Sequence, residues 1–531
     1  MPFRMTSRPQ LSGFFWWRRR AEHAVMRHET DMWDDPSKFQ ADRQLISFVI
    51  AALVCAGCLV MAFFRPQGTI GNAKIVEARG TGELYVMVNG RLDRVENLAS
   101  ARLIIGSADK PQQVTAAAIA SKPQGPRVGI LGAPSLMSPN PSDDSTWSVC
   151  DEYQSGAASP LDPNTGLPTL DASAVITTAI GGPLKISADT ATKINPGAAR
   201  VMTFANTTWL VYPKADGTVV RAQFDLNNAG VATALGIDRS TQMVPMSRGL
   251  FNAIPAAPAL TVPTIPDAGA VPGFKIATPG VKVGSVLSVR DVRGEEGFYV
   301  VLRNGVQQIP LVMASLIRTG NSQGATRTAD VTPDVLADVP RVEPLSTDSY
   351  PTSTSKVLDA KAAPVTCFTW TQNGNQPVAV TAVLAGQSLP LTDSQRKSAF
   401  DLVTADKSKG VVADRVYVPA DGGGRYVRAA PAQPDTMVRG TGWWIGSNGV
   451  RYGIAQDEAA VGSTAASTGQ LDATAAALGI GSPVPAPWPI VSLFAEGPTL
   501  SKQAAATQRD GVDIDRGAVA LPTTPAAAAG K

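Results

Sequence analysis

The sequence predicts a single N-terminal transmembrane helix, followed by a large α+β region with a β-rich central core and four ββα-like repeat domains. Three observations support this fold class. One uncharged apolar run of 20 residues lies near the start of the 531-residue chain. The composition, with 48 Gly, 41 Pro and only 17% charged residues, favours short strands and turns over long helices. A strand–turn–strand–helix pattern then recurs four times along the chain.

The first 44 residues are predicted to form a cytoplasmic connecting segment with one amphipathic helix. Residues 14–32 contain no Gly or Pro, and their apolar side chains recur at helical spacing. The aromatic and basic side chains at the start of this stretch suit the surface of a membrane with anionic lipids, and they equally suit docking onto a partner protein. A solvated flanking helix is the third interpretation. The residues assigned to docking are Phe14, Trp16, Trp17, Arg18, Arg19 and Arg20.

Residues 45–64 are predicted to form the transmembrane helix. At 1.5 Å per residue the run spans about 30 Å, the thickness of a bilayer core. A cleaved signal peptide is the alternative, but its apolar stretch is usually about 7–15 residues long and follows a short basic region. Eight Lys and Arg residues precede the run and three lie in the 20 residues after it. The sequence therefore predicts a single-pass protein of the inner (cell) membrane, with a cytoplasmic N-terminus and residues 65–531 in the periplasm.

The four cysteines form two pairs of different character. Cys55 and Cys58 lie inside the apolar run, where a metal site, a redox pair or a lipid-modified cysteine lacks the necessary surroundings. We interpret them as small apolar side chains of a membrane helix. Cys150 and Cys367 each lie three residues from a tryptophan in a strand-like stretch. Two cysteines in an exported region indicate a disulfide rather than two free thiols, and this bond would join positions far apart in the chain.

The repeated pattern consists of a strand, an Asn-Gly or Asp-Gly turn, a second strand and a short helix. Asn-Gly is the strongest hairpin signal, because both turn residues need positive φ. The four copies start at Leu84, Trp209, Phe298 and Trp443. Four copies of one theme at irregular spacing indicate a duplicated small module, and the long gaps between them are assigned to the strand-rich core.

These patterns divide the chain into segments. They are the cytoplasmic segment 1–44, the transmembrane helix 45–64, repeat domain 1 (65–110), the first segment of the core domain (111–200), repeat domain 2 (201–255), a linker (256–275), repeat domain 3 (276–320), the second segment of the core domain (321–430), repeat domain 4 with a C-terminal core-packing segment (431–507), and a disordered tail (508–531). A second linker is expected from Asp151 to Pro168, which is rich in Ser, Pro and Gly.

The sequence contains no recognisable active site. His23 and His28 are the only histidines, which excludes Ser-His-Asp, Cys-His and histidine–zinc chemistry from the rest of the chain. No GxxxxGK[ST] motif is present, and the nearest fragment, Gly181–Lys185, has the wrong spacing. Gly422–Gly424 is interpreted as a hairpin turn. A net charge of +3 gives no support for nucleic-acid binding. No catalytic, cofactor-binding or metal-binding residue is predicted, and no cofactor is expected from the residues.

Several short blocks, in a fixed order, carry a family resemblance. They are Arg65–Gly68, Ile75–Val76, Gly82–Val86, Asn97–Leu103, Gly125–Gly129, Gly132–Pro134, Trp147–Cys150, Ala486–Pro489 and Gly497–Ser501. In this order they resemble the EccB family of the type VII (ESX) secretion system of actinobacteria, from about Leu11 to Arg509. The Asn-Leu-Ala-Ser-Ala-Arg block at residues 97–102 is the most diagnostic of them. Its Asn97 and Arg102 are expected to satisfy turns or helix ends.

The resemblance implies a structural core component of an inner-membrane secretion complex. It implies a periplasmic region, with a disulfide, that multimerises to stabilise the complex and to shape the export path for folded proteins. The implied partners are EccC, EccD and EccE, further copies of the chain, for which a hexamer is one arrangement, and membrane lipids. Some family members are labelled ATPases, so a periplasmic nucleotide hydrolase is the alternative function, and ATP is the one cofactor that the resemblance raises.

Overall fold

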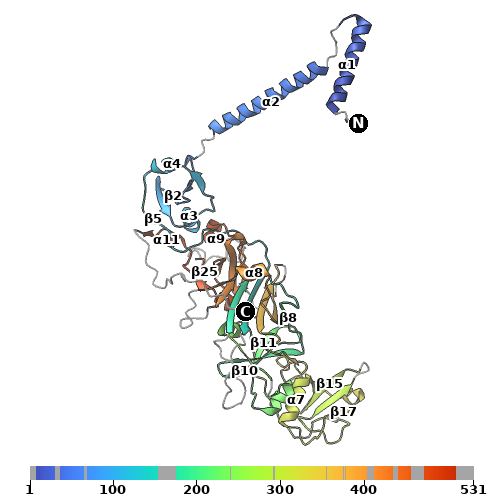
Figure 1. Ribbon diagram of the computed structural model, residues 1–531. Helices are drawn as coiled ribbons and strands as arrows, with labels where there is room; N and C mark the ends of the chain where they lie inside the picture. Colours follow the sequence, from blue (N-terminus) through green and yellow to red (C-terminus); the bar gives the residue numbers. More distant parts are fainter. Residues whose placement is uncertain are drawn as a thin grey trace, which may run out of the picture. The chain divides into compact units, whose positions relative to one another are not determined.

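The computed structural model describes residues 8–29, 36–64, 68–153, 175–238, 241–290, 294–354, 356–374, 376, 378–402, 412–433, 440–455 and 472–509. The chain forms two compact units. The first contains the N-terminal helices up to Gly71 together with residues 113–119, and the second contains the remainder. Figure 1 labels some of their helices and strands.

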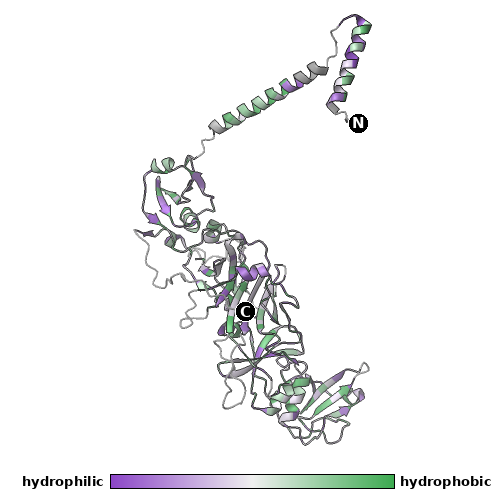
Figure 2. Ribbon diagram, viewed as in Figure 1, coloured by the Kyte–Doolittle hydropathy of each residue, from purple (hydrophilic) through white to green (hydrophobic). Residues whose placement is uncertain are grey.

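The first unit contains the two long helices α1 (Arg8–Arg27) and α2 (Pro36–Phe64). In the described ranges, α2 is the one helix long and apolar enough to cross a membrane, over Asp42–Met61 with a mean hydropathy of 2.4. None of this span is buried in the structure. Figure 2 shows hydrophobic residues along most of α2 and a mixture of polar and apolar residues on α1. The predicted anchor at 45–64 therefore lies on a single uninterrupted helix. The chain passes between the units again at β4 (Gln112–Val114) and α4 (Ala116–Ala120).

Four sheets of the second unit begin with three antiparallel strands followed by a helix. The first sheet has β1 (Ile75–Ala78), β2 (Leu84–Val88), β3 (Arg91–Val95) and α3 (Leu98–Ile105). The second has β9 (Ala198–Phe204), β10 (Thr207–Pro213), β11 (Val219–Phe224) and α5 (Ala229–Leu235). The third has β14 (Val286–Arg290), β15 (Glu296–Leu302), β16 (Gly305–Ile309) and α7 (Leu311–Gly320). The fourth has β23 (Gly424–Ala430), β24 (Gly442–Gly446), β25 (Val450–Gly453) and α9 (Ala473–Leu478).

After the helix, the chain returns to the sheet edges as short parallel strands. In the second sheet β12 (Val244–Pro245) pairs with β9, and β13 (Ala256–Ala257) pairs with β11 after α6 (Arg248–Ala253). In the fourth, β26 (Val484–Pro487) pairs with β23, and β27 (Ala495–Glu496) pairs with β25 after α10 (Trp488–Val491). In the third, β17 (Ala329–Val331) pairs with β14 and precedes the 3₁₀ helix η2 (Pro333–Leu336). In the first, β5 (Arg127–Val128) pairs with β3 and with β28 (Gln508–Arg509), which follows α11 (Lys502–Ala505).

The core sheet is formed from segments far apart in the sequence. Its strand order is β21-β22-β7-β6-β19-β20-β8. The strands are β6 (Ser145–Tyr153), β7 (Val175–Gly181), β8 (Ala191–Lys193), β19 (Val365–Gln372), β20 (Val380–Gly386), β21 (Phe400–Asp401) and β22 (Arg415–Tyr417). The helix α8 (Asp393–Ser398) contacts β22 of this sheet. The 3₁₀ helix η3 (Asp421–Gly423) comes directly before β23, and β18 (Lys356–Val357) pairs with β9 of the second sheet.

One large hydrophobic cluster connects the core sheet to the second and fourth sheets. Trp147 on β6 and Trp370 on β19 are directly opposite in register and each is only 2% exposed. They pack in the same cluster as Val211 of the second sheet and Val427 of the fourth. Burying side chains of this size contributes the largest apolar areas available to a core. The two tryptophans that flank the predicted cysteines therefore lie in the centre of the molecule's packing.

The helices of the four sheets pack in two pairs. Val231 and Leu235 of α5 share a cluster with Leu316 of α7. Leu103 of α3 shares another cluster with Leu478 of α9. Each helix thus buries its apolar face against its own sheet and against the helix of one other sheet, which joins the second sheet to the third and the first to the fourth.

Four local predictions need correction. Gly422–Gly424 is not a hairpin turn, because β22 before it belongs to the core sheet and β23 after it to the fourth sheet. The predicted linker 256–275 begins with strand β13. The predicted linker from Asp151 begins inside β6, and its residues 154–168 lie outside the described ranges. The predicted disordered tail begins with β28, and its residues 510–531 lie outside the described ranges. Strands of two or three residues leave no periodic signal in a sequence.

Candidate functional site

The described part of the chain contains no group of three or more His, Cys, Asp or Glu side chains that could hold a metal ion. The acidic pair at 143–144 lies in a turn, where Asp144 accepts a hydrogen bond of 3.1 Å from the main-chain N–H of Gly374. This hydrogen bond connects the segment before β6 to the segment after β19.

Cys150 and Cys367 form a disulfide at the centre of the core sheet, with an S–S length of 2.03 Å. The two residues are directly opposite on the neighbouring strands β6 and β19, and both are fully buried. The bond joins positions 217 apart and so connects the two halves of the core sheet covalently. Cys55 and Cys58 of α2 are free and exposed.

A buried acidic side chain follows this disulfide. Asp151 accepts hydrogen bonds from the main-chain N–H of Ser247 (2.7 Å), from the Ser247 hydroxyl (2.8 Å) and from the Thr177 hydroxyl (3.0 Å). Ser247 is the N-cap of α6, so one carboxylate connects β6, β7 and α6. Burial raises the pKa of Asp151 to about 6, although the three hydrogen bonds act in the opposite direction, and the nearby Asp414 raises it further. Nothing in the sequence indicates that Asp151 connects these three elements.

This carboxylate predicts an unusual pH dependence of stability. In the unfolded chain Asp151 ionises near its ordinary pKa of 3.8, whereas in the folded protein it ionises near 6. The raised pKa means that the neutral carboxyl group favours the folded state. This contribution to the free energy of unfolding is fully present below pH 3.8 and is lost as the pH rises through 6. We expect the free energy of unfolding of the wild type to fall by up to about 3 kcal/mol relative to Asp151→Asn between about pH 4 and 7. Urea unfolding of both full chains across that range measures this difference, and parallel curves would contradict it.

The Asn97–Arg102 block joins the first sheet to the fourth. Asn97 is the N-cap of α3, where its side-chain oxygen accepts from the Ser100 N–H, and its amide donates to the Ile130 carbonyl at 2.7 Å. Arg102 donates at 2.8 Å to the carbonyl of Leu478, the last residue of α9. Burial lowers the pKa of Arg102. Both residues therefore satisfy helix ends, as expected from the sequence, and Arg102 does so on the helix of another sheet.

Removing the Arg102 side chain should weaken this joint. A hydrogen bond from a charged group to a half-buried carbonyl contributes about 1.5–3 kcal/mol, so we expect Arg102→Ala to lower the free energy of unfolding by about 2 kcal/mol. The control is Arg428→Ala, which removes an exposed arginine from β23 and should change stability by less than about 0.5 kcal/mol. Urea unfolding of the two variants compares them directly, and equal losses would show that Arg102 has no special role.

The residues assigned to docking all lie on α1. Phe14 is 57% exposed and Trp17 is 64% exposed. The guanidinium of Arg20 lies 5.4 Å from the centre of the Trp16 ring, and Arg18 forms an ion pair of 2.9 Å with Glu22. The helix thus presents large aromatic side chains and cations together. Such exposed apolar groups indicate a surface that a membrane or another protein covers.

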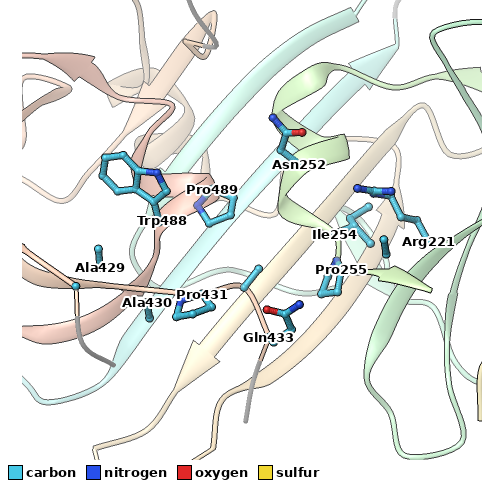
Figure 3. A pocket seen from close by; sticks show the side chains of 13 residues that line it. Arg221, Asn252, Ile254, Pro255, Ala429, Ala430, Pro431, Gln433, Trp488 and Pro489 are labelled. Carbon is cyan, nitrogen blue, oxygen red and sulfur yellow. The ribbon is translucent and has the colours of Figure 1, made fainter. Parts of the chain in front are cut away.

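A pocket of about 580 Å³ lies between the second and fourth sheets (Figure 3). Its wall includes Arg221 of β11, Asn252 of α6 and Pro255 directly before β13. The opposite part of the wall includes Gln433, which follows β23, and Trp488 of α10. A more polar pocket of about 430 Å³ lies on the first sheet between Glu83, Glu96 and Arg127. Neither pocket could be found from the sequence, because their walls come from segments that only the fold brings together.

Comparisons with known proteins agree on one family. The family model described as "Type VII secretion system ESX-1, transport TM domain B", EccB, matches residues 3–514. The chain is 36% identical to the ESX-2 secretion system ATPase EccB2 of Mycobacterium tuberculosis, over 99% of this chain and 100% of the relative. It is also 36% identical to the ESX-3 secretion system ATPase EccB3 of Mycolicibacterium smegmatis, over 96% of this chain and 92% of the relative.

Two solved structures resemble most or nearly all of the chain. One is a chain of the intact ESX-5 inner membrane complex, with 29% identity and a TM-score of 0.69 over 98% of this chain and 99% of that chain. The other is from the structure of the EccB3 dimer from the ESX-3 core complex, with 34% identity and a TM-score of 0.67 over 82% of this chain and 100% of that chain. The likeness extends over the apolar helix as well as the β-rich region in the ESX-5 case.

Proposed function

The chain belongs to the EccB family of the type VII (ESX) secretion system, and we propose how its parts serve the inner-membrane complex of which that family is a core component. The observation that supports a structural role most directly is the combination of one apolar membrane span with a large β-rich region. In that region, the side chains of Arg102 and Asp151 connect elements that lie far apart in the sequence.

The proposed orientation places the N-terminus in the cytoplasm and residues 65–531 in the periplasm. It rests on the excess of Lys and Arg before the apolar run, eight against three in the 20 residues that follow it. The disulfide supports the same orientation, since such bonds persist in oxidising compartments. In this arrangement α1 lies on the cytoplasmic side and the five sheets lie outside.

The proposed partners follow from this orientation. On the cytoplasmic side, α1 docks onto other components of the complex, for which EccC, EccD and EccE are the candidates, and onto membrane lipids. On the periplasmic side, the β-rich region contacts further copies of the chain and shapes the export path for folded proteins. A relative was solved as a dimer, which supports contact between copies.

We further propose that the four sheets outside the core are copies of one repeat. The proposal is supported by the order of elements that the four sheets share. In each sheet, three antiparallel strands are followed by a helix and then by a short parallel strand that pairs with the same sheet. The observed unit is larger than the ββα theme expected from the sequence. It gains a first strand, such as β9 or β23, and the short strands after the helix.

Purification of the complex tests the structural role. The full chain, tagged at its C-terminal end and extracted in mild detergent, should bring down EccC, EccD and EccE in one large particle of defined mass. Recovery of the chain alone as a monomer or dimer under the same conditions would overturn the proposal.

A nucleotide hydrolase is the second candidate, because the names of the relatives include the word ATPase. The sequence has no P-loop motif with which to bind phosphates. Phosphate release by the purified full chain, measured with ATP and Mg²⁺ and compared with buffer, distinguishes the two functions. A turnover that a carboxylate substitution abolishes would establish the enzyme.

A further inference from the structure

Two arginines occupy the same place in the second and fourth sheets. Arg221 on β11 and Arg451 on β25 each lie on the third strand of their sheet. The Nε of Arg221 donates to the main-chain carbonyl of Phe251 at 2.8 Å, and the Nε of Arg451 donates to that of Phe494 at 3.0 Å. Both carbonyls belong to the segment that leads into the last strand of the sheet.

Each arginine also lies beside a tryptophan of the second strand. The guanidinium carbon of Arg221 is 5.0 Å from the ring centre of Trp209, and that of Arg451 is 5.4 Å from Trp443. In both sheets the strand partner of the arginine is the residue two positions after the tryptophan. Each indole N–H donates to the threonine hydroxyl two residues before it, at 2.7 Å for Trp209 and 2.9 Å for Trp443. The same local arrangement is therefore built twice.

The two copies differ in the partner of the guanidinium. In the fourth sheet the residue opposite Arg451 is Glu496, whose carboxylate lies 3.2 Å from the guanidinium. In the second sheet the residue opposite Arg221 is Ala256. Within the described residues, the hydrogen bond to Phe251 is the only one that the Arg221 side chain makes, and it forms no ion pair. The terminal nitrogens of Arg221 are therefore available for a ligand. In the fourth sheet, the corresponding position is filled by the carboxylate of Glu496.

Arg221 and Ala256 both line the 580 Å³ pocket. The guanidinium carbon lies 3.6 Å from the centre of the Phe251 ring, which fixes its plane. Figure 3 shows Arg221 and Asn252 on the side of the pocket opposite Trp488. Burial of Arg221 lowers its pKa, and no carboxylate among the described residues offsets this effect. A fixed, partly desolvated guanidinium recognises a carboxylate through two parallel hydrogen bonds.

We propose that this pocket binds the carboxylate of an apolar peptide segment on the guanidinium of Arg221, in the position that Glu496 occupies beside Arg451. The apolar wall of Pro255, Pro431 and Trp488 accommodates the neighbouring side chains of the peptide. The amides of Asn252 and Gln433 can donate to and accept from its main chain. The inference is independent of the proposed scaffold function, since it concerns one pocket between two sheets.

Three short peptides test the site on the full detergent-purified chain by calorimetry. Acetyl-Ala-Pro-Ala-Ala carries a C-terminal carboxylate, acetyl-Ala-Pro-Ala-Glu-amide carries a side-chain carboxylate, and acetyl-Ala-Pro-Ala-Ala-amide carries none. We expect one of the first two to bind at least about tenfold tighter than the third, which would also identify the source of the carboxylate. Equal affinities, or no binding of either acidic peptide up to about 1 mM, would overturn the proposal.

Two variants then locate the interaction. Arg221→Gln should abolish the preference for the acidic peptide, whereas Arg428→Gln, which changes an exposed arginine of β23, should keep it. Ala256→Glu retains Arg221 and supplies the missing partner from the chain itself, so it should weaken binding of the acidic peptide by about tenfold without lowering the unfolding temperature. A preference that persists in both Arg221→Gln and Ala256→Glu would contradict the site. Recovery of the secretion complex with Arg221→Gln separates this result from the scaffold function.

Discussion

Replacing both cysteines of the core-sheet disulfide by alanine should lower the free energy of unfolding of the full chain by about 5 kcal/mol. The bond between Cys150 and Cys367 closes a loop of 217 residues. In the loop-entropy account, a crosslink over a loop of this length restricts the unfolded chain by about that amount. A loss of this size is comparable to a large fraction of the stability of an ordinary domain. The core sheet should therefore unfold at much lower urea concentration in the double variant.

The chain contains its own control for this experiment. Cys55 and Cys58 are free and exposed on α2, so replacing both by alanine removes the same atoms without breaking a crosslink. We expect this second double variant to unfold with the wild type. A loss of stability of similar size in both double variants, or in neither, would contradict the role assigned to the disulfide.

The features that could be predicted from the sequence are those that neighbouring residues determine, namely the apolar helix, a hairpin turn and a helix cap. The apolar run ends with α2, and the Asn-Gly turn at Asn89 has the positive φ angles of 50° and 81° that this pair adopts readily. Asn97 caps the helix that follows it, because a short amide side chain reaches the free N–H groups of the first turn. Each of these features depends on residues within a few positions of one another, which makes it visible in the sequence alone.

The joints between sheets could not be predicted in the same way. Asp151 depends on Ser247, 96 positions later, and Arg102 depends on the Leu478 carbonyl, 376 positions later. Neither partner differs in type from many other residues of the chain. The short strands after each helix were missed for a related reason, since two residues such as Ala256–Ala257 pair only because the neighbouring strand is already in place. Ala256, opposite Arg221, suggests a missing carboxylate only when it is compared with Glu496, which lies opposite Arg451 in the fourth sheet.

The docking role that we propose for α1 rests on large aromatic side chains, of which Phe14 and Trp17 are exposed. We expect the triple variant Phe14→Ala, Trp16→Ala, Trp17→Ala to lose EccC, EccD and EccE from the purified particle, with at least about a tenfold fall in recovery. Large aromatic side chains truncated at a packed interface commonly account for losses of this size, because aromatic residues contribute most of the binding energy of such surfaces. The matched control is Met26→Ala, which removes an apolar side chain that is 85% exposed near the end of the same helix.

The outcome also separates two of the three interpretations of α1, docking onto proteins and binding to a lipid surface. If the helix docks onto proteins, the triple variant stays in the membrane through α2 but loses its partners, and Arg18→Gln with Arg19→Gln weakens recovery in a salt-dependent manner. If the helix lies on anionic lipid, the same variants retain their partners in detergent and lose only affinity for anionic vesicles. Full recovery of the complex with the triple variant would therefore exclude protein docking by α1 and leave the β-rich region and α2 to hold the chain in the assembly.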